Sequence, residues 1–83
     1  MRAAIAIRNF AFSPGSLTIR VGTTVVVTND DSVTHTWTAN KGGFDSGDLA
    51  PGQSFQFTFA NIGIYAYHCA IHTFMTGTIT VTT

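Results

Sequence analysis

The sequence predicts an all-β domain, and three observations support this fold class. No segment carries a sustained 3.6-residue apolar period, so helix signals are missing. Valine, isoleucine, phenylalanine, tyrosine and threonine dominate the stretches between turns, as they do in strands. Turn residues recur at intervals of roughly ten residues, a spacing typical of a β-sandwich. The turn clusters occupy residues 13–15, 21–23, 29–32, 40–43, 50–52 and 61–63.

About seven short strands are expected between these turns, and alternation gives each strand a face toward the core. In the first third of the chain the predicted strands cover residues 5–7, 17–21 and 25–27. The inward side chains of these three strands are Ile5, Ile7, Leu17, Ile19, Val21, Val25 and Val27.

The next predicted strand covers residues 33–39. Val33, His35, Trp37 and Ala39 share one phase in it, so His35 is expected on the apolar face. Residues 41–53 are the least strand-like part of the chain, and we interpret them as a surface connection that crosses between the two sheets.

Three further strands are predicted at residues 55–59, 65–69 and 79–81. Their inward side chains are Phe55, Phe57, Phe59, Tyr65, Tyr67, Cys69, Ile79 and Val81. Cys69 therefore also points inward, although it lies far from His35 in the sequence.

Length and cysteine content limit how such a domain can be stabilised. The 83 residues are expected to form one domain, residues 1–83, which buries only about 60 to 65% of the surface of its unfolded chain. With a single cysteine, an internal disulfide is impossible. A bound metal is the remaining candidate for a stabilising cross-link.

Charge and hydropathy argue against several classes of partner. Charged residues make up 10% of the chain, the formal net charge is zero, and there is no basic run, so we expect no nucleic-acid partner. The apolar stretches are too short to span a membrane, and residues 1–5 lack the apolar region and cleavage site of a signal peptide. We therefore expect any signal or anchor to have been removed, or never to have existed.

One cluster of residues stands out chemically. Cys69, His72 and Met75 follow one another at Cys-x2-His-x2-Met spacing, and the inward His35 would add a second imidazole. One thiolate, two imidazoles and a weak axial thioether are the ligand set of a blue-copper electron-transfer site. The sequence therefore predicts a type 1 copper centre with these four ligands.

Each ligand also has a simpler interpretation. A lone cysteine in an apolar strand is usually inert, a lone histidine is usually structural, and Met75 could fill a gap in the core. The cysteine, histidine and methionine occur together at the spacing of metal ligands, which makes copper the better interpretation. Structural zinc fits less well, because zinc sites rarely include a thioether. By alternation His68 points away from the site, as a surface residue, unless it binds a second copper.

The chain resembles the cupredoxins, and its ligand loop is similar to that of amicyanin. The resemblance rests on the ligand spacing and on six further segments that together cover most of the chain. These segments are residues 12–17, 21–25, 29–36, 44–47, 49–55 and 63–65. It implies a Greek-key β-sandwich with one copper per chain held by His35, Cys69, His72 and Met75. It also implies a one-electron carrier between redox proteins, not an enzyme, located in the periplasm or outside the cell.

The ligand segments depart from this family's pattern in two places. Relatives often have asparagine after the first ligand histidine, where this chain has Thr36, whose hydroxyl could tie the ligand segments together near Ala70. Relatives also tend to have proline beside the loop histidine, where Ile71 and Thr73 stand. Their backbone N–H groups could add hydrogen bonds toward the sulfur, or the absence of proline could loosen the loop.

Electrons are expected to enter and leave through His72, close to the surface. Ile71, Phe74 and the segment containing Phe12 and Pro14 would form an apolar collar around it, suited to brief docking of a redox partner on a monomer. Two alternatives remain open. The chain could be a copper carrier, or it could be a domain of a multicopper enzyme.

Overall fold

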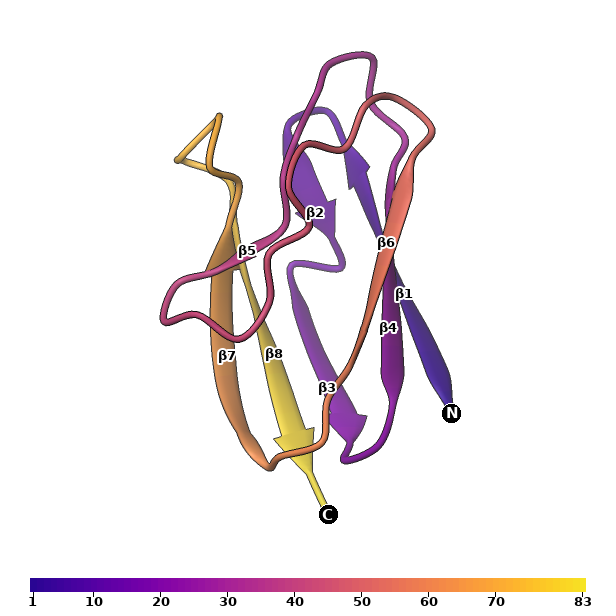
Figure 1. The fold of residues 1–83 in the computed structure, drawn as a ribbon, viewed down its shortest axis with the longest axis vertical. Coiled ribbons are helices and arrows are strands. Elements are labelled where there is room, and N and C mark those ends of the chain that lie inside the picture. The colour runs from indigo at the N-terminus through magenta and orange to yellow at the C-terminus, as the bar shows by residue number, and fades with distance from the viewer.

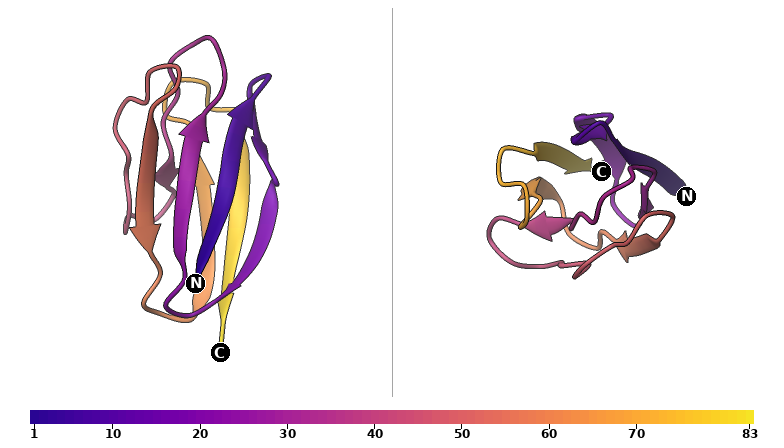
Figure 2. Two further views of the ribbon diagram at one scale, coloured as in Figure 1. Left: turned by 90° about the vertical axis from the view of Figure 1, so that its right-hand side faces the viewer. Right: turned by 90° about the horizontal axis from the view of Figure 1, so that it is seen from above.

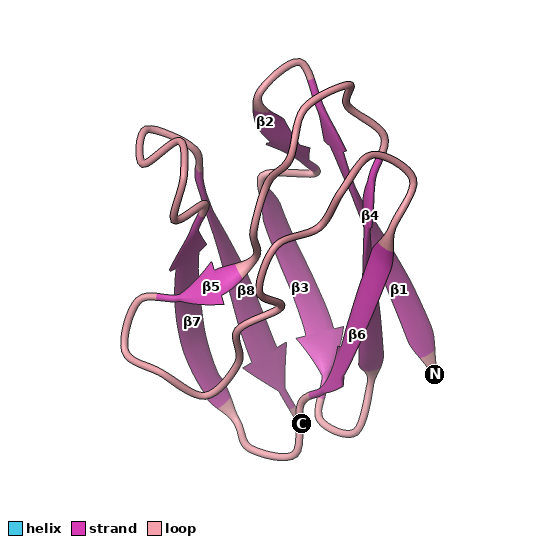
Figure 3. Ribbon diagram, turned by 45° about the horizontal axis from the view of Figure 1, so that its top comes forward, coloured by secondary structure: helices cyan, strands magenta, loops and turns pink.

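The computed structural model describes residues 1–83 as eight strands joined by turns and loops, without a helix (Figure 3). It therefore has no helix that could cross a membrane. The strands are β1 (Arg2–Arg8), β2 (Ala11–Ser13), β3 (Ser16–Arg20), β4 (Thr24–Asn29), β5 (Thr38–Ala39), β6 (Ser54–Thr58), β7 (Gly63–His68) and β8 (Thr76–Thr82). The predicted all-β class is confirmed, with one strand more than the approximate number expected.

Two four-stranded sheets face each other, in the orders β2-β1-β4-β6 and β3-β8-β7-β5. Both are mixed, because β1 runs parallel to β4 and β3 runs parallel to β8. Every connection from β2 to β7 passes from one sheet to the other, whereas β1–β2 and β7–β8 are hairpins within a sheet. This gives the Greek-key sandwich that the sequence predicts, and Figures 1 and 2 show its two layers.

The core lies between the sheets and follows the predicted alternation in the long strands. The inward residues of β1, β4 and β8 are almost completely buried: Ile5, Ile7, Val25, Val27, Ile79 and Val81. Val21, in contrast, was expected inside and is 41% exposed, because β3 ends one residue before it. Phe55 and Phe57 are only half-buried, because β6 lies at the edge of its sheet.

The prediction of a strand over residues 33–39 is mostly wrong. Only Thr38–Ala39 form a strand, while His35 makes an isolated bridge to Leu49. The predicted surface connection over residues 41–53 instead contributes to the core, since Leu49 and Phe44 are buried. Phe44 packs on Trp37 with ring centroids 4.2 Å apart, filling the side of the sandwich that the two-residue β5 leaves open.

Strand β2 was not predicted, because the turn before it lacks the usual residues. Asn9 and Phe10 form the two-residue connection of the β1–β2 hairpin and have φ values of 50° and 58°. Positive φ at both positions matches a type I′ turn, which usually contains glycine. A bulky phenylalanine in this conformation is uncommon, so another contact must hold it there.

Two tyrosines of β7 differ in how their hydroxyl groups are satisfied. Tyr65 donates a hydrogen bond to the carbonyl of Asn61 at 2.8 Å. The hydroxyl of the buried Tyr67 has no partner, and its ring lies over Gly77, which is paired with it across the sheet. A Cβ atom at position 77 would collide with the Tyr67 ring, so only glycine fits there while this ring keeps its position.

Three connections gather at the end of the sandwich opposite both termini: the β1–β2 turn, the β4–β5 connection and the β7–β8 loop (Figure 1). His35 lies in the second of these, and Cys69, His72 and Met75 lie in the third. The topology therefore brings residues from distant parts of the sequence to one end of the molecule.

Candidate metal centre

A thiol and two imidazoles converge at this end of the sandwich. The ligating atoms of His35, Cys69 and His72 all lie within 4.8 Å of one another. The Sγ atom of Cys69 is 3.7 Å from Nδ1 of His35 and 3.9 Å from Nδ1 of His72. The two Nδ1 atoms are 3.2 Å apart, so all three atoms face a common point.

These separations fit one shared metal ion. For a zinc-sized ion, two bound imidazole nitrogens can be at most about 4.2 Å apart, and a nitrogen and a thiolate sulfur about 4.4 Å. All three observed distances are shorter than these limits. The arrangement can therefore hold an ion without a change of backbone.

Backbone N–H groups around Cys69 favour the thiolate form of its side chain, which binds metals. The side chain is completely buried, and burial alone would raise the pKa of the thiol. The N–H groups of His72 and Thr36, which lie 3.5 and 3.4 Å from Sγ, act in the opposite direction, as do His35 and the N–H of Ile71. Together they lower the pKa of Cys69 to about 6, which favours the thiolate, the form that binds metals.

Met75 lies beside the other predicted ligands. Its backbone N–H donates to the carbonyl of His72 at 2.9 Å, and its carbonyl accepts from the N–H of Cys69 at 3.1 Å. The residue is 2% exposed. These bonds close the loop that carries three of the four predicted ligands.

Thr36 connects this loop to the segment that carries His35. Its hydroxyl accepts a hydrogen bond from the N–H of Ala70 at 2.7 Å and lies 2.9 Å from the hydroxyl of Thr38. Its backbone N–H points to the sulfur of Cys69. One residue therefore holds the two ligand segments together by its side chain and its backbone.

His35 and His68 occupy different environments, as alternation predicts. His35 is completely buried, and its Nε2 lies 2.9 Å from Oδ2 of Asp31. His68 is half-buried, and its Nδ1 lies 2.6 Å from Oδ1 of Asn40, outside the ligand cluster. The interpretation of His68 as a hydrogen-bonded residue near the surface agrees with this contact.

The surface around His72 differs from the predicted collar in one position. Phe12 is buried and packs edge-on against Tyr67, so its assignment to an exposed collar is wrong. Phe10 takes this place: it is 41% exposed, with its ring centroid 5.0 Å from that of His72 and 5.5 Å from that of His35. Pro14 is exposed, as predicted for this surface.

Two exposed residues of the predicted collar remain beside Phe10. Ile71 is 49% exposed, and Phe74 is 72% exposed with its ring centroid 6.3 Å from that of His72. We call Phe10, Ile71 and Phe74 the apolar collar. The half-buried His72 is the only predicted ligand that combines some exposure with contact to this surface.

Phe10 and Asp31 contact the predicted ligands, although neither is predicted as a site residue from the sequence. Asp31 stands four residues before His35, and a metal-binding histidine usually donates its second N–H to a carboxylate or carbonyl. This rule could have identified Asp31 from the sequence as a partner of His35. Nothing in the sequence indicated Phe10, because only the β1–β2 hairpin, which was not predicted, brings its ring over the histidines.

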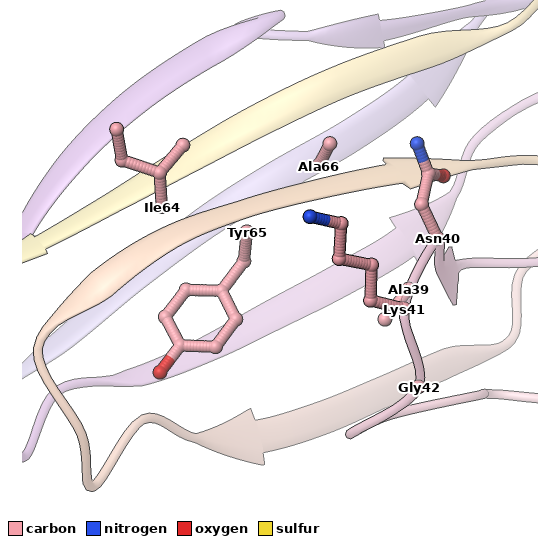
Figure 4. Close-up of a pocket in the computed structure, with 7 residues that line it drawn as sticks. All are labelled: Ala39, Asn40, Lys41, Gly42, Ile64, Tyr65 and Ala66. Carbon is pink, nitrogen blue, oxygen red and sulfur yellow. The ribbon is translucent and has the colours of Figure 1, made fainter.

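A separate cavity of about 300 Å³ lies along β7 and the residues after β5 (Figure 4). Its lining consists of Ala39, Asn40, Lys41, Gly42, Ile64, Tyr65 and Ala66. None of the predicted copper ligands belongs to it, so it is distinct from the metal centre.

Comparison with known families agrees with this geometry. The family model described as a cupredoxin-like domain matches residues 2–81. No sequence among the curated proteins matches the chain.

Several solved structures share the fold over nearly the whole chain. A purple cupredoxin from Nitrosopumilus maritimus is 36% identical with a TM-score of 0.89, over 96% of this chain and 99% of that one. A reduced variant of amicyanin is 26% identical with a TM-score of 0.87, over 94% of this chain and 79% of that one. A copper-containing nitrite reductase from Thermus scotoductus SA-01 is 28% identical with a TM-score of 0.93, but this chain spans only 23% of its length.

Proposed function

Because the chain belongs to the cupredoxin-like family, we propose that it is a mononuclear type 1 copper protein that carries single electrons between redox proteins. The observation that carries this proposal is the convergence of one thiol and two imidazole nitrogens within 4.8 Å. One copper per chain would be held by His35, Cys69, His72 and Met75, and would alternate between Cu(I) and Cu(II).

The protein's contribution is a rigid and dry set of ligands. His35, Cys69 and Met75 are each at most 2% exposed, and hydrogen bonds that involve Thr36, together with others within the β7–β8 loop, hold the segments that carry them. A fixed site suits electron transfer, because the ligands need not move when the oxidation state changes. The lowered pKa of Cys69 supports a thiolate as the ligand at neutral pH.

We propose that redox partners dock on the apolar collar and that electrons pass through His72. A small apolar surface suits brief encounters, which bury less than about 1,200 Å². Since the formal net charge is zero, the electron-transfer rate should depend little on ionic strength. A steep decrease of that rate with added salt would contradict docking on this surface.

The proposal also covers the oligomeric state and the location of the protein. We propose that residues 1–83 act as one monomeric domain, in the periplasm or outside the cell, without catalytic activity of their own. The similarity to purple cupredoxin and amicyanin supports this choice.

The similarity to a nitrite reductase favours a second candidate, a domain of a multicopper enzyme. His68 adjoins Cys69 and could in principle link two metal sites. However, the chain has only three histidines, and Nδ1 of His68 already contacts Asn40. A second copper would therefore need ligands from another chain. A copper carrier is the remaining alternative, and ready transfer of copper to an acceptor would distinguish it.

The visible spectrum of the copper-loaded protein, combined with metal analysis, tests the proposal. We expect one copper per chain, an intense absorption from the thiolate, and reversible one-electron voltammetry. Cys69→Ser should abolish the absorption, while His68→Ala, the matched change at the neighbouring position, should preserve it. Absorption that survives in Cys69→Ser would contradict the ligand assignment, and nitrite reductase or oxidase turnover would favour the enzyme.

A further inference from the structure

A single carboxylate oxygen connects a predicted copper ligand to the apolar collar. Oδ2 of Asp31 lies 2.9 Å from Nε2 of His35 and accepts a hydrogen bond from the N–H of Phe10 at 3.0 Å. The other oxygen, Oδ1, accepts from the N–H of Ser32 at 3.2 Å. The Asp31 side chain is 12% exposed, and the histidine ring that it contacts is completely buried.

The contact with His35 determines which ring nitrogen is free. An ionised carboxylate can only accept hydrogen bonds, so Nε2 of His35 must carry the hydrogen in this contact. In a neutral imidazole, Nδ1 is then the unprotonated nitrogen, and it is the atom that faces Cys69 and His72. The N–H of Phe10 and the ring of His35 hold the pKa of the Asp31 carboxyl below its usual value, consistent with an ionised group.

The hydrogen bond between Asp31 and Phe10 also accounts for the unusual backbone conformation at Phe10. Asn9 and Phe10 both have positive φ, a conformation that bulky residues adopt only when their surroundings hold them in it. The bond from Phe10 N–H to Asp31 supplies this support. It also places the Phe10 ring edge-on against both His35 and His72.

We propose that Asp31 is a positioning residue of the copper site, which presents Nδ1 of His35 to the metal and holds Phe10 over the ligand histidines. This inference deepens the proposed function and rests on it for the role of copper. The negative charge next to a ligand also favours Cu(II) over Cu(I), and therefore lowers the reduction potential.

Asp30 provides a matched control, because it is the neighbouring residue and carries the same charge. Its carboxylate lies 3.5 Å from Nη2 of Arg8 at the surface and has no contact with the predicted ligands His35 and His72. The variants Asp31→Asn and Asp30→Asn change the net charge equally. A difference between them therefore reports the contact with His35 and Phe10.

The first measurement is the tautomer of His35 in the copper-free protein, by long-range ¹H–¹⁵N NMR at mildly alkaline pH. We expect the Nε2–H form in the wild type and in Asp30→Asn, and a mixture of tautomers in Asp31→Ala. An unchanged tautomer in Asp31→Ala would overturn the proposal. If Asp31→Ala does not fold, Asp31→Asn replaces it, with a weakened preference for the Nε2–H form as the expected result.

The second measurement uses the copper-loaded protein. Asp31→Ala should lower the affinity for Cu(II) by about 10- to 100-fold, as losses of such supporting partners do. Asp31→Asn should raise the reduction potential more than Asp30→Asn does, and equal potentials would count against the proposed charge effect. If the wild type binds no copper but the tautomer still depends on Asp31, the positioning role stands and the proposed function fails.

Discussion

The hydroxyl of Thr36 accepts a hydrogen bond from the N–H of Ala70 at 2.7 Å, and this bond joins residues 34 positions apart. It connects the segment of His35 to the loop of Cys69, His72 and Met75. Along the polypeptide chain, residues 37–69 separate these two segments. The hydrogen bond therefore links the two halves of the metal centre directly.

Thr36→Val should lower the free energy of unfolding of the copper-free protein by about 1 kcal/mol, the usual net contribution of one hydrogen bond. Valine keeps the shape of threonine but cannot accept the Ala70 N–H. Chemical denaturation measures the effect. Thr38→Val serves as the control, because it removes hydroxyl contacts to Thr36 and Asp45 but keeps the Ala70 bond. Equal losses in both variants would contradict this role.

Met75→Leu should leave copper bound and raise the reduction potential, because loss of the thioether donor disfavours Cu(II) relative to Cu(I). The exchange conserves volume, so the core should tolerate it at a cost below about 1.5 kcal/mol. Voltammetry of the copper-loaded protein measures the shift. An unchanged potential would show that Met75 is not an axial ligand.

The stability of the copper-free protein should depend on pH through Cys69. Its pKa falls from 9.0 to about 6 on folding, so the folded state favours the thiolate. The resulting stabilisation is fully present above pH 9, decreases as the pH falls toward 6, and is absent below that value. Urea unfolding of the reduced wild type and of Cys69→Ala across this range measures the difference. Parallel curves for the two proteins would refute the lowered pKa.

The two tyrosines of β7 should respond in opposite directions to removal of the hydroxyl. Tyr67→Phe should raise the free energy of unfolding by about 1 kcal/mol, because the buried hydroxyl has no partner. Tyr65→Phe should lower it by a similar amount, because it loses the bond to Asn61. Thermal unfolding of the copper-free variants measures both, and a loss of stability in Tyr67→Phe would indicate a hidden partner for its hydroxyl.

The fold and the inward direction of the ligands could be predicted because both depend on alternation. Ile5, Val25 and Ile79 follow the period of two that a half-buried strand imposes. The same rule placed His35 and Cys69 inside, even though His35 lies in an irregular segment rather than a strand. The inward direction of His35 is kept there because His35 pairs with Leu49 in an isolated antiparallel bridge.

The contacts that support the site could not be predicted in the same way. The position of Phe10 depends on a turn with positive φ that contains no glycine, and that turn depends on Asp31, 21 residues away. The burial of Phe44 depends on its packing against Trp37, seven residues earlier in an irregular part of the chain. Such features arise from tertiary contacts, which leave no periodic pattern in the sequence.

Gly77 and Tyr67 face each other so closely that no side chain fits at position 77 while the phenol ring keeps its place. A side chain at 77 would push the phenol ring aside and, through it, the strand that leads to Cys69. During divergence these two sites must therefore vary as a pair: a larger residue opposite β7 becomes acceptable only in a lineage that has first replaced the tyrosine with something smaller.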